Sequence, residues 1–97
     1  MQDEKFAWDE EKSRINFQKH GVSFNEAKTV FSDDFLIYLA DEEHSRDEER
    51  FIVIGESARL RLLVVCHCYR EDDEIIRLIS ARKATKTETD WYYGGMI

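Results

Sequence analysis

The order of apolar and polar positions predicts two helices in the first third of the chain. Asp9 is a favourable N-cap for the first helix, and Gly21 is suited to end it in a left-handed conformation. At about 100° per residue, this helix turns Asn16 and His20, rather than an apolar stripe, toward the body of the protein. A second helix is predicted to open with a capping box over residues 23–26, in which a serine and a glutamate each satisfy a backbone amide.

Four strand-like runs follow, at residues 35–40, 50–55, 62–70 and 74–84, and the pattern also allows a short strand at residues 6–8. The short connectors between consecutive runs favour antiparallel hairpins. A second capping box, at residues 85–88, predicts a C-terminal helix. The predicted fold class is therefore α+β, with two N-terminal helices packed on a four-stranded, mainly antiparallel sheet and a C-terminal helix.

The predicted strands carry apolar residues at both odd and even positions, and therefore on both faces of the sheet. In residues 62–66, for example, Leu62, Val64 and Cys66 alternate with Leu63 and Val65. A sheet with one face in water would alternate more cleanly. We therefore expect the N-terminal helices to cover one face, and the C-terminal helix, a partner protein or a second copy to help cover the other.

Length and composition narrow the class of protein. A chain of 97 residues with 42% hydrophobic residues is expected to form a single domain, residues 1–97, with a real core. The charged first residues show no signal peptide, and the longest apolar run falls short of the roughly 18 residues that a membrane span needs. The two cysteines suit no disulfide framework, so we expect a cytoplasmic protein.

Charge is unevenly distributed along the chain, which has formal net charge −7. Residues 1–58 hold 7 basic and 15 acidic side chains, whereas residues 59–97 hold 7 and 6. The acidic first part argues against nonspecific attraction to nucleic acid, and the second part leaves room for a local basic site.

Arginines cluster in and before the last two predicted strands. Because a guanidinium offers paired donors to anionic oxygens, the cluster is a candidate phosphate clamp; a solvated strand edge with surface ion pairs is the alternative. Strand alternation puts Arg82 and Arg77 on opposite faces unless a bulge intervenes, so without one they cannot serve one site. We favour Arg82 and Arg70 for contact with phosphate.

Three further candidates each have two interpretations. His20, beside Lys19 at a helix C-terminus, either locks the first helix through a hydrogen bond or donates a proton. Tyr69 either stacks on a base or fills the core. The Cys-His-Cys run at residues 66–68 looks like a metal site, but alternation puts the sulfurs and the imidazole on opposite faces, so we predict no metal there.

Longer motifs stand in order along the chain. They are Phe6-x-Trp8-Asp9-x-x-Lys12, Asn16-x-x-Lys19-His20-Gly21-Val22-Ser23-Phe24, Glu49-Arg50-x-x-x-Ile54-Gly55, Arg61-x-Leu63-x-Val65 and Arg77-x-Ile79-Ser80-Ala81-Arg82. Together they resemble the BrnT family of toxins over nearly the whole chain. One departure is Leu60, since the family often has glycine before the position of Arg61.

The resemblance implies a toxin of a type II toxin–antitoxin system, with a RelE-like fold and a ribonuclease activity that arrests translation without a cofactor. It implies RNA as substrate and a BrnA-like ribbon-helix-helix antitoxin as partner, with DNA contacted only through the antitoxin. A heterotetramer with the antitoxin, or a homodimer alone, is the expected assembly. We assign catalysis to His20, Lys19, Arg82 and Arg70, and RNA binding to Arg61, Arg77 and Tyr69.

A rival interpretation comes from a different class of protein. A toxin-shaped, non-catalytic module would bind its antitoxin and help it repress their operon, and the net acidity and the lack of an obvious acid–base pair favour it. A metal-binding protein built on Cys66, Cys68 and the histidines is a more distant alternative.

Overall fold

The computed structural model describes residues 5–41, 48–70, 72 and 74–95. Its elements are β1 (Phe6–Ala7), α1 (Glu10–His20), α2 (Phe24–Ala27), η1 (Lys28–Ser32), β2 (Ile37–Ala40), β3 (Phe51–Glu56), β4 (Leu62–Arg70), β5 (Ile75–Lys83), α3 (Lys86–Asp90) and η3 (Trp91–Gly95). The acidic connectors between the strand-like runs, at residues 41–49 and 71–73, lie largely outside the described residues.

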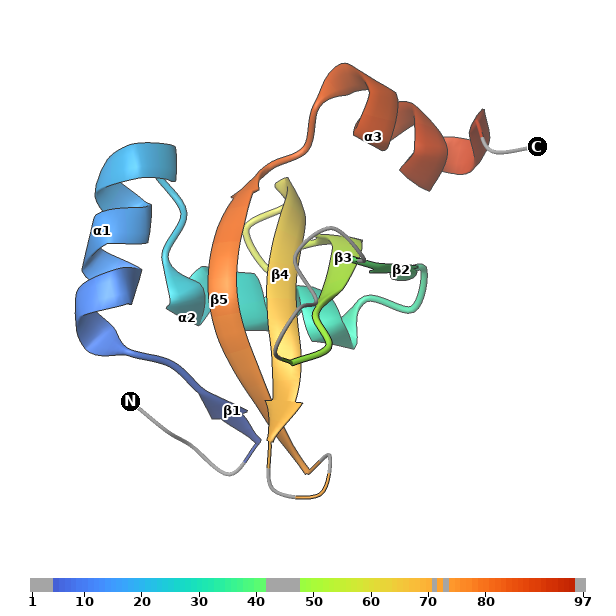
Figure 1. The fold of residues 1–97 in the computed structure, drawn as a ribbon. Coiled ribbons are helices and arrows are strands. Elements are labelled where there is room, and N and C mark those ends of the chain that lie inside the picture. The colour runs from blue at the N-terminus through green and yellow to red at the C-terminus, as the bar shows by residue number, and fades with distance from the viewer. Residues whose placement is uncertain (1–4, 42–47, 71, 73, 96–97) are drawn as a thin grey trace.

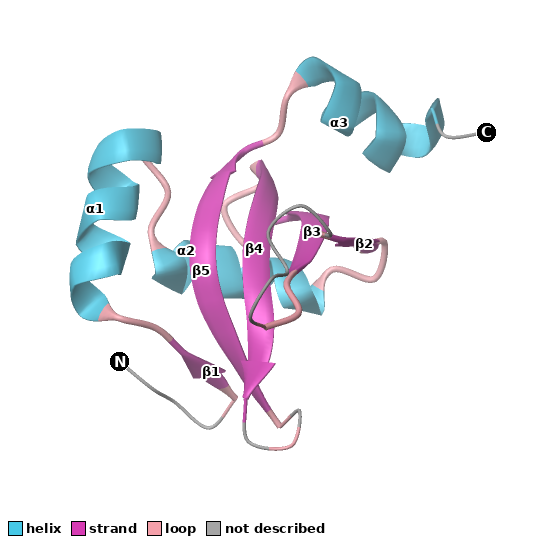
Figure 2. Cartoon of the chain, in the orientation of Figure 1, coloured by secondary structure: helices cyan, strands magenta, loops and turns pink. Residues whose placement is uncertain are grey.

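The strands form one five-stranded sheet in the order β1-β5-β4-β3-β2 (Figures 1 and 2). Strands β2 to β5 pair antiparallel with their neighbours in sequence, as predicted, whereas β1 pairs parallel to β5. The α+β class is therefore confirmed, and the prediction of four strands is wrong by one. The additional strand has two residues, which is too short for alternation to predict its pairing.

Helices cover one face of this sheet. In Figure 1, α2 lies behind β5 and β4, α1 lies beside β5, and α3 lies beyond the end of β5 rather than across the near face. We call the near face the open face. Among the described residues, no helix is long and apolar enough to cross a membrane.

The main core lies between the sheet and the segment of α2 and η1. Phe24, Ala27 and Val30 are fully buried there against strand residues such as Val53 and Val65. One close approach needs a glycine: a Cβ at Gly55 would lie 3.2 Å from Val30 Cβ and 2.5 Å from Leu36 Cδ1. This strand can therefore come close to η1 because residue 55 has no side chain.

The predicted helix boundaries are confirmed where they depend on local caps. The Asp9 carboxylate accepts hydrogen bonds from the Glu11 and Lys12 backbone N–H groups at 2.8 and 3.1 Å, and Gly21 ends α1 with φ at 70°. The capping box at the start of α3 is present in both directions. At α2 it is half formed: Ser23 Oγ accepts from Glu26 N at 3.1 Å, but the Glu26 carboxylate turns elsewhere.

The polar inner side of α1 has a structural cause. Asn16 is buried, and its Nδ2 donates to Val22 O and Ala81 O, both at 2.9 Å, while its Oδ1 accepts from Ala81 N at 3.1 Å. The amide thus serves the backbone of β5 as a neighbouring strand would. A helix that packs in this way needs no apolar stripe.

A β-bulge interrupts the pairing of β4 with β5. Cys66 pairs with Ser80, but the next residue, His67, pairs with Leu78, so Ile79 has no partner on β4. An extra residue in one strand reverses the side-chain alternation beyond it. Arg77 and Arg82, which simple alternation would put on opposite faces, therefore lie on the same face of the sheet.

Candidate functional site

Three of the predicted site arginines lie on the open face. Arg77 pairs with Cys68 and Arg82 with Val64, and Arg70 stands on β4 in the same alternation as these two partners. Directly opposed residues of antiparallel strands point to the same face. The bulge therefore brings Arg77 onto the face of Arg82, which was the condition for the two to serve one surface.

These arginines occupy two ends of that face. Val64 and Cys68 are four residues apart on β4, so Arg82 and Arg77 are separated by about 14 Å along the sheet. Arg70 lies two residues further on, about 20 Å from the register of Arg82. The structure brings Arg70 and Arg77 to one end, and it does not bring Arg70 and Arg82 together.

Arg82 is held by a carboxylate of α3. Its Nη1 and Nη2 donate to Glu88 Oε1 and Oε2 at 2.7 and 2.8 Å, and Nη1 also reaches Lys83 O at 3.3 Å. The Arg82 hydrogen bonds are the main reason that the pKa of Glu88 falls to about 2. Because the Arg82 side chain remains 41% exposed, the guanidinium is positioned by Glu88 but still accessible.

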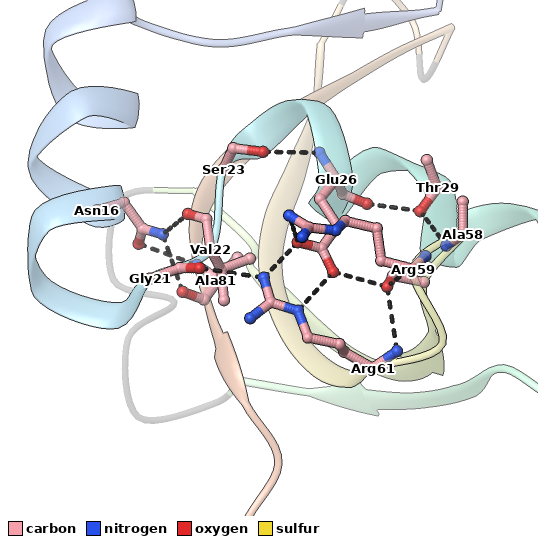
Figure 3. Close-up of polar contacts among 11 residues, drawn as sticks. Asn16, Gly21, Val22, Ser23, Glu26, Thr29, Ala58, Arg59, Arg61 and Ala81 are labelled. Atoms are coloured by element: carbon pink, nitrogen blue, oxygen red, sulfur yellow. Dashed lines mark hydrogen bonds and ion pairs between the residues drawn. The ribbon is translucent and has the colours of Figure 1, made fainter.

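Arg61 is part of a more buried cluster (Figure 3), which we call the Glu26 clamp: Glu26, Ser57, Arg59 and Arg61. Arg61 Nε donates to Glu26 Oε2 at 2.9 Å, Arg61 Nη2 contacts both Glu26 Oε1 and Gly21 O, and Ser57 Oγ donates to Glu26 Oε2 at 2.7 Å. The Glu26 side chain is only 4% exposed. Hydrogen bonds from Arg61 are the main cause that lowers the pKa of Glu26.

The clamp fixes the turn between β3 and β4 against α2. Ala58 N donates to Thr29 Oγ1 at 2.8 Å, and Thr29 Oγ1 donates to Glu26 O at 2.6 Å (Figure 3). Leu60 in this turn has φ at 62°, the left-handed conformation that glycine favours. These contacts favour a structural role for Arg61, and its RNA-binding role stays a prediction.

The remaining predicted site residues come from α1 and from the helix-covered face of the sheet. Lys19 is exposed and His20 half-buried in the last turn of α1. Tyr69 lies on the helix-covered face, with its ring 5.5 Å from that of Phe51 and 5.3 Å from that of His67. Tyr69 is therefore not placed to stack on a base beside Arg70, its neighbour in sequence.

The Cys-His-Cys run is divided between the two faces, as alternation predicts. His67 is fully buried among aromatic rings, while Cys66 and Cys68 point to the open face as free thiols. Burial is the main cause that raises the pKa of Cys66 to about 11. Among the described residues, no group of three or more His, Cys, Asp or Glu side chains is arranged to hold a metal ion.

Lys12 and Arg50 were not among the predicted site residues. Both line a small cavity with Arg70 and Arg77. Both belong to motifs in the sequence, but their positions on α1 and before β3 gave no sign that they would meet.

Comparison with known proteins agrees with this architecture. The chain belongs to the BrnT family, described as the ribonuclease toxin of type II toxin–antitoxin systems, whose model matches residues 8–88. A crystal structure of the Brucella abortus ribonuclease toxin, BrnT, is similar, with 26% sequence identity and a TM-score of 0.62 over 87% of this chain and 100% of that chain. A search of curated proteins finds no match. The resemblance seen in the sequence is therefore confirmed.

Proposed function

We propose that this chain is the toxin component of a type II toxin–antitoxin system and cleaves RNA on the open face of its sheet without a metal ion. Cleavage would arrest translation, and a BrnA-like antitoxin would neutralise it. Family membership supports the class of activity. The observation that supports the location is the bulge at Ile79, because it puts Arg77 and Arg82 on one accessible face.

The chemistry needs few protein groups. In RNA the 2′-hydroxyl can attack the neighbouring phosphate, so the site must accept one proton, supply another and stabilise the additional charge of the phosphorane. Arg82 is the best candidate to stabilise this charge, because it is half-exposed and two hydrogen bonds to Glu88 fix its orientation. Preorganised donors of this kind contribute most when they need no rearrangement during the reaction.

Proton transfer is assigned to the end of α1. His20 and Lys19 lie in the last turn of α1, and an imidazole can both donate and accept a proton. We propose His20 as the group that donates or accepts the proton and Lys19 as an electrostatic contributor. Catalysis is then dominated by positioning and charge rather than by a carboxylate base.

The experiment that tests this assignment compares Arg82→Ala with Glu88→Gln. Both variants remove the same ion pair, but only the first removes the guanidinium. We expect Arg82→Ala to relieve growth arrest and abolish RNA cleavage while antitoxin binding is retained, and Glu88→Gln to retain most of the cleavage. Loss of antitoxin binding together with cleavage in Arg82→Ala would show that Arg82 is structural.

One observation favours a second candidate function, the non-catalytic co-repressor. Arg61 and Arg82 are both bound to carboxylates, in a chain of net charge −7. Incubating the purified protein with RNA in a chelator separates the two proposals. Fragments that end in a cyclic phosphate support the nuclease, and intact RNA at high protein excess supports the co-repressor.

The partners follow from the same proposal. We propose a ribbon-helix-helix antitoxin, with contact to DNA through that antitoxin, in a cytoplasmic heterotetramer. A homodimer is proposed for the toxin alone. Size-exclusion chromatography with light scattering on the toxin, with and without its antitoxin, measures both states.

A further inference from the structure

A small cavity of about 190 Å³ lies at the end of the open face that carries Arg70 and Arg77. Among the residues that the structure describes, its charged lining is Lys12, Arg50, Arg70, Arg77 and Glu48. These side chains come from α1, from the residues just before β3, from the end of β4 and from β5. The fold therefore gathers cations here from segments that are far apart in the sequence.

The described charged residues that line this cavity are mainly cationic. Four cationic side chains face one lining carboxylate, Glu48, which lies 3.3 Å from Arg70. That pair is exposed on both sides, at 46% and 38%, so an anion from solution can exchange with it at little cost. Asp9 lies nearby: the Lys12 backbone N–H is the main cause that lowers its pKa, and the charges of Lys12 and Arg77 contribute less. Among the described residues that line the cavity, cationic side chains therefore outnumber carboxylates.

The size of the cavity limits what it can hold. Sites for drug-sized molecules occupy about 300–1,000 Å³, so about 190 Å³ suits a group smaller than a nucleoside. A phosphate group fits this limit, and guanidinium groups match its oxygens with paired donors. The Lys12 ammonium adds a compact charge at the edge formed by α1.

The position of the cavity connects it to the proposed cleavage site. Arg77 and Arg82 share the open face, with Ser80 between them on β5 and on that same face. The cavity is about 14 Å from the register of Arg82, too far for both to touch one phosphate. A polyanion that lies along β5 would meet both ends.

We propose that this cavity is a second phosphate subsite, which holds one backbone phosphate of a single-stranded RNA whose reacting phosphate lies at Arg82. Lys12 and Arg50 are then positioning residues for the substrate. The identity of the ligand as RNA rests on the proposed function, whereas the preference for a phosphate group rests on the cavity itself.

The test measures binding without cleavage. A fluorescent, fully 2′-O-methylated single-stranded RNA, which lacks the attacking hydroxyl, is titrated by anisotropy at several salt concentrations. Lys12→Gln and Arg50→Gln are expected to weaken binding about tenfold each. The double variant should reduce the magnitude of the negative slope of log K against log salt by about 0.7, the contribution of one phosphate on a single strand, and each single variant should reduce it by part of that amount.

The matched control is Arg14→Gln, which removes one cation from the exposed side of α1, away from the cavity. We expect its affinity and salt slope to equal those of the wild type. The same effect in Arg14→Gln as in Lys12→Gln, or no binding of the RNA by the wild type, overturns the subsite. Lys12 is exposed, so its variant tests the proposal even if Arg50→Gln fails to fold.

A second arm distinguishes RNA from free phosphate. Inorganic phosphate is titrated into the labelled wild-type protein, and the backbone amide signals of the residues around the cavity are followed by NMR. Amide signals that shift at millimolar phosphate would identify a free-anion site if the Lys12→Gln and Arg50→Gln variants bind the RNA as tightly as the wild type. That result would overturn the RNA subsite. A protein that binds the RNA through Lys12 and Arg50 but cleaves none retains the subsite and loses the nuclease proposal.

Discussion

Arginines on the helix-covered side of the sheet and arginines on the open face meet their partners in different ways. In the Glu26 clamp, Arg61 binds a carboxylate that is 4% exposed and also a backbone carbonyl. On the open face, Arg70 pairs with Glu48 in a contact where both side chains are more than a third exposed. The first guanidinium is held by a buried partner, and the second can exchange its partner for a ligand.

Arg82 lies between these two cases. Its carboxylate partner Glu88 is 16% exposed, while Arg82 itself is 41% exposed. The comparison therefore indicates that the burial of the acidic partner, more than the presence of an ion pair, decides whether an arginine is structural. This conclusion can be tested on stability alone, without any assay of RNA.

The largest change in the free energy of unfolding is expected for Glu26→Ala. It leaves Arg61 and Ser57 without their shared acceptor, and we expect a loss of about 3 kcal/mol in the free energy of unfolding, measured with urea at pH 7. The control is Glu11→Ala, which removes an exposed pair with Arg14 and should leave stability unchanged. If Glu26→Ala lost little stability, buried and exposed acidic partners could not be distinguished by their effect on the fold.

The pH dependence of this contribution has a definite sign. The pKa of Glu26 is lowered from 4.5 in the folded state, chiefly by Arg61. The unfolded chain therefore binds the proton more readily, so the stabilisation is present above pH 4.5 and is lost as the pH falls below it. Glu26→Ala should not show this part of the acid loss.

The next effect concerns His67, the buried histidine on the helix-covered side. It is fully buried beside Phe31, at 4.9 Å between ring centroids, and burial lowers its pKa from 6.5 to about 4. Within the described part of the chain, neither ring nitrogen is paired in a hydrogen bond, although the Val65 backbone offsets part of the burial effect.

As the pH falls from 6.5 toward 4, the unfolded chain takes up a proton at His67 that the folded protein resists. The wild type should therefore lose about 2–3 kcal/mol of stability over this range. In His67→Leu this loss should disappear from unfolding curves recorded between pH 7 and pH 4, whereas the half-exposed His20→Gln should retain it. An unchanged profile in His67→Leu would contradict the assignment.

A smaller effect, of opposite sign, is expected at the turn that the clamp holds. Leu60 has φ at 62° and is 78% exposed, so its side chain gains little from packing and strains the backbone. Leu60→Gly should raise the free energy of unfolding by about 1 kcal/mol. Ala58→Gly in the same turn should instead lower it by roughly 0.5–1 kcal/mol, because no left-handed conformation is relieved there.

The smallest change in the free energy of unfolding is expected for a substitution on the open face. Arg70→Ala removes an exposed ion pair and should cost about 0.5 kcal/mol or less in urea unfolding. A loss as large as that of Glu26→Ala would mean that Arg70 is structural, and the cavity would then lose one of its available cations.

Local signals in the sequence were sufficient for much of the fold. The caps at Asp9 and Gly21 fix the ends of α1, and the antiparallel order of β2 to β5 follows from short connectors. The partner of Glu26 was not predictable, because Ser23 already suggested a use for the carboxylate and Arg61 is 35 residues away.

The candidate site was predicted less completely for a related reason. Whether Arg77 and Arg82 share a face depends on one unpaired residue, Ile79, and a β-branched residue within a strand gives no sign of a bulge. The meeting of Lys12 with Arg50 depends on how α1 packs beside β5, which no local pattern encodes.

The Asn16 amide has a consequence for how this protein can associate. By occupying the outward N–H and C=O of Ala81, it blocks strand pairing at that point of β5, beyond the two residues that β1 covers. We therefore expect a strand from another chain to pair with the opposite edge of the sheet, along β2. Edge-to-edge growth into fibres, or binding of an extended peptide as an added strand, would begin at β2.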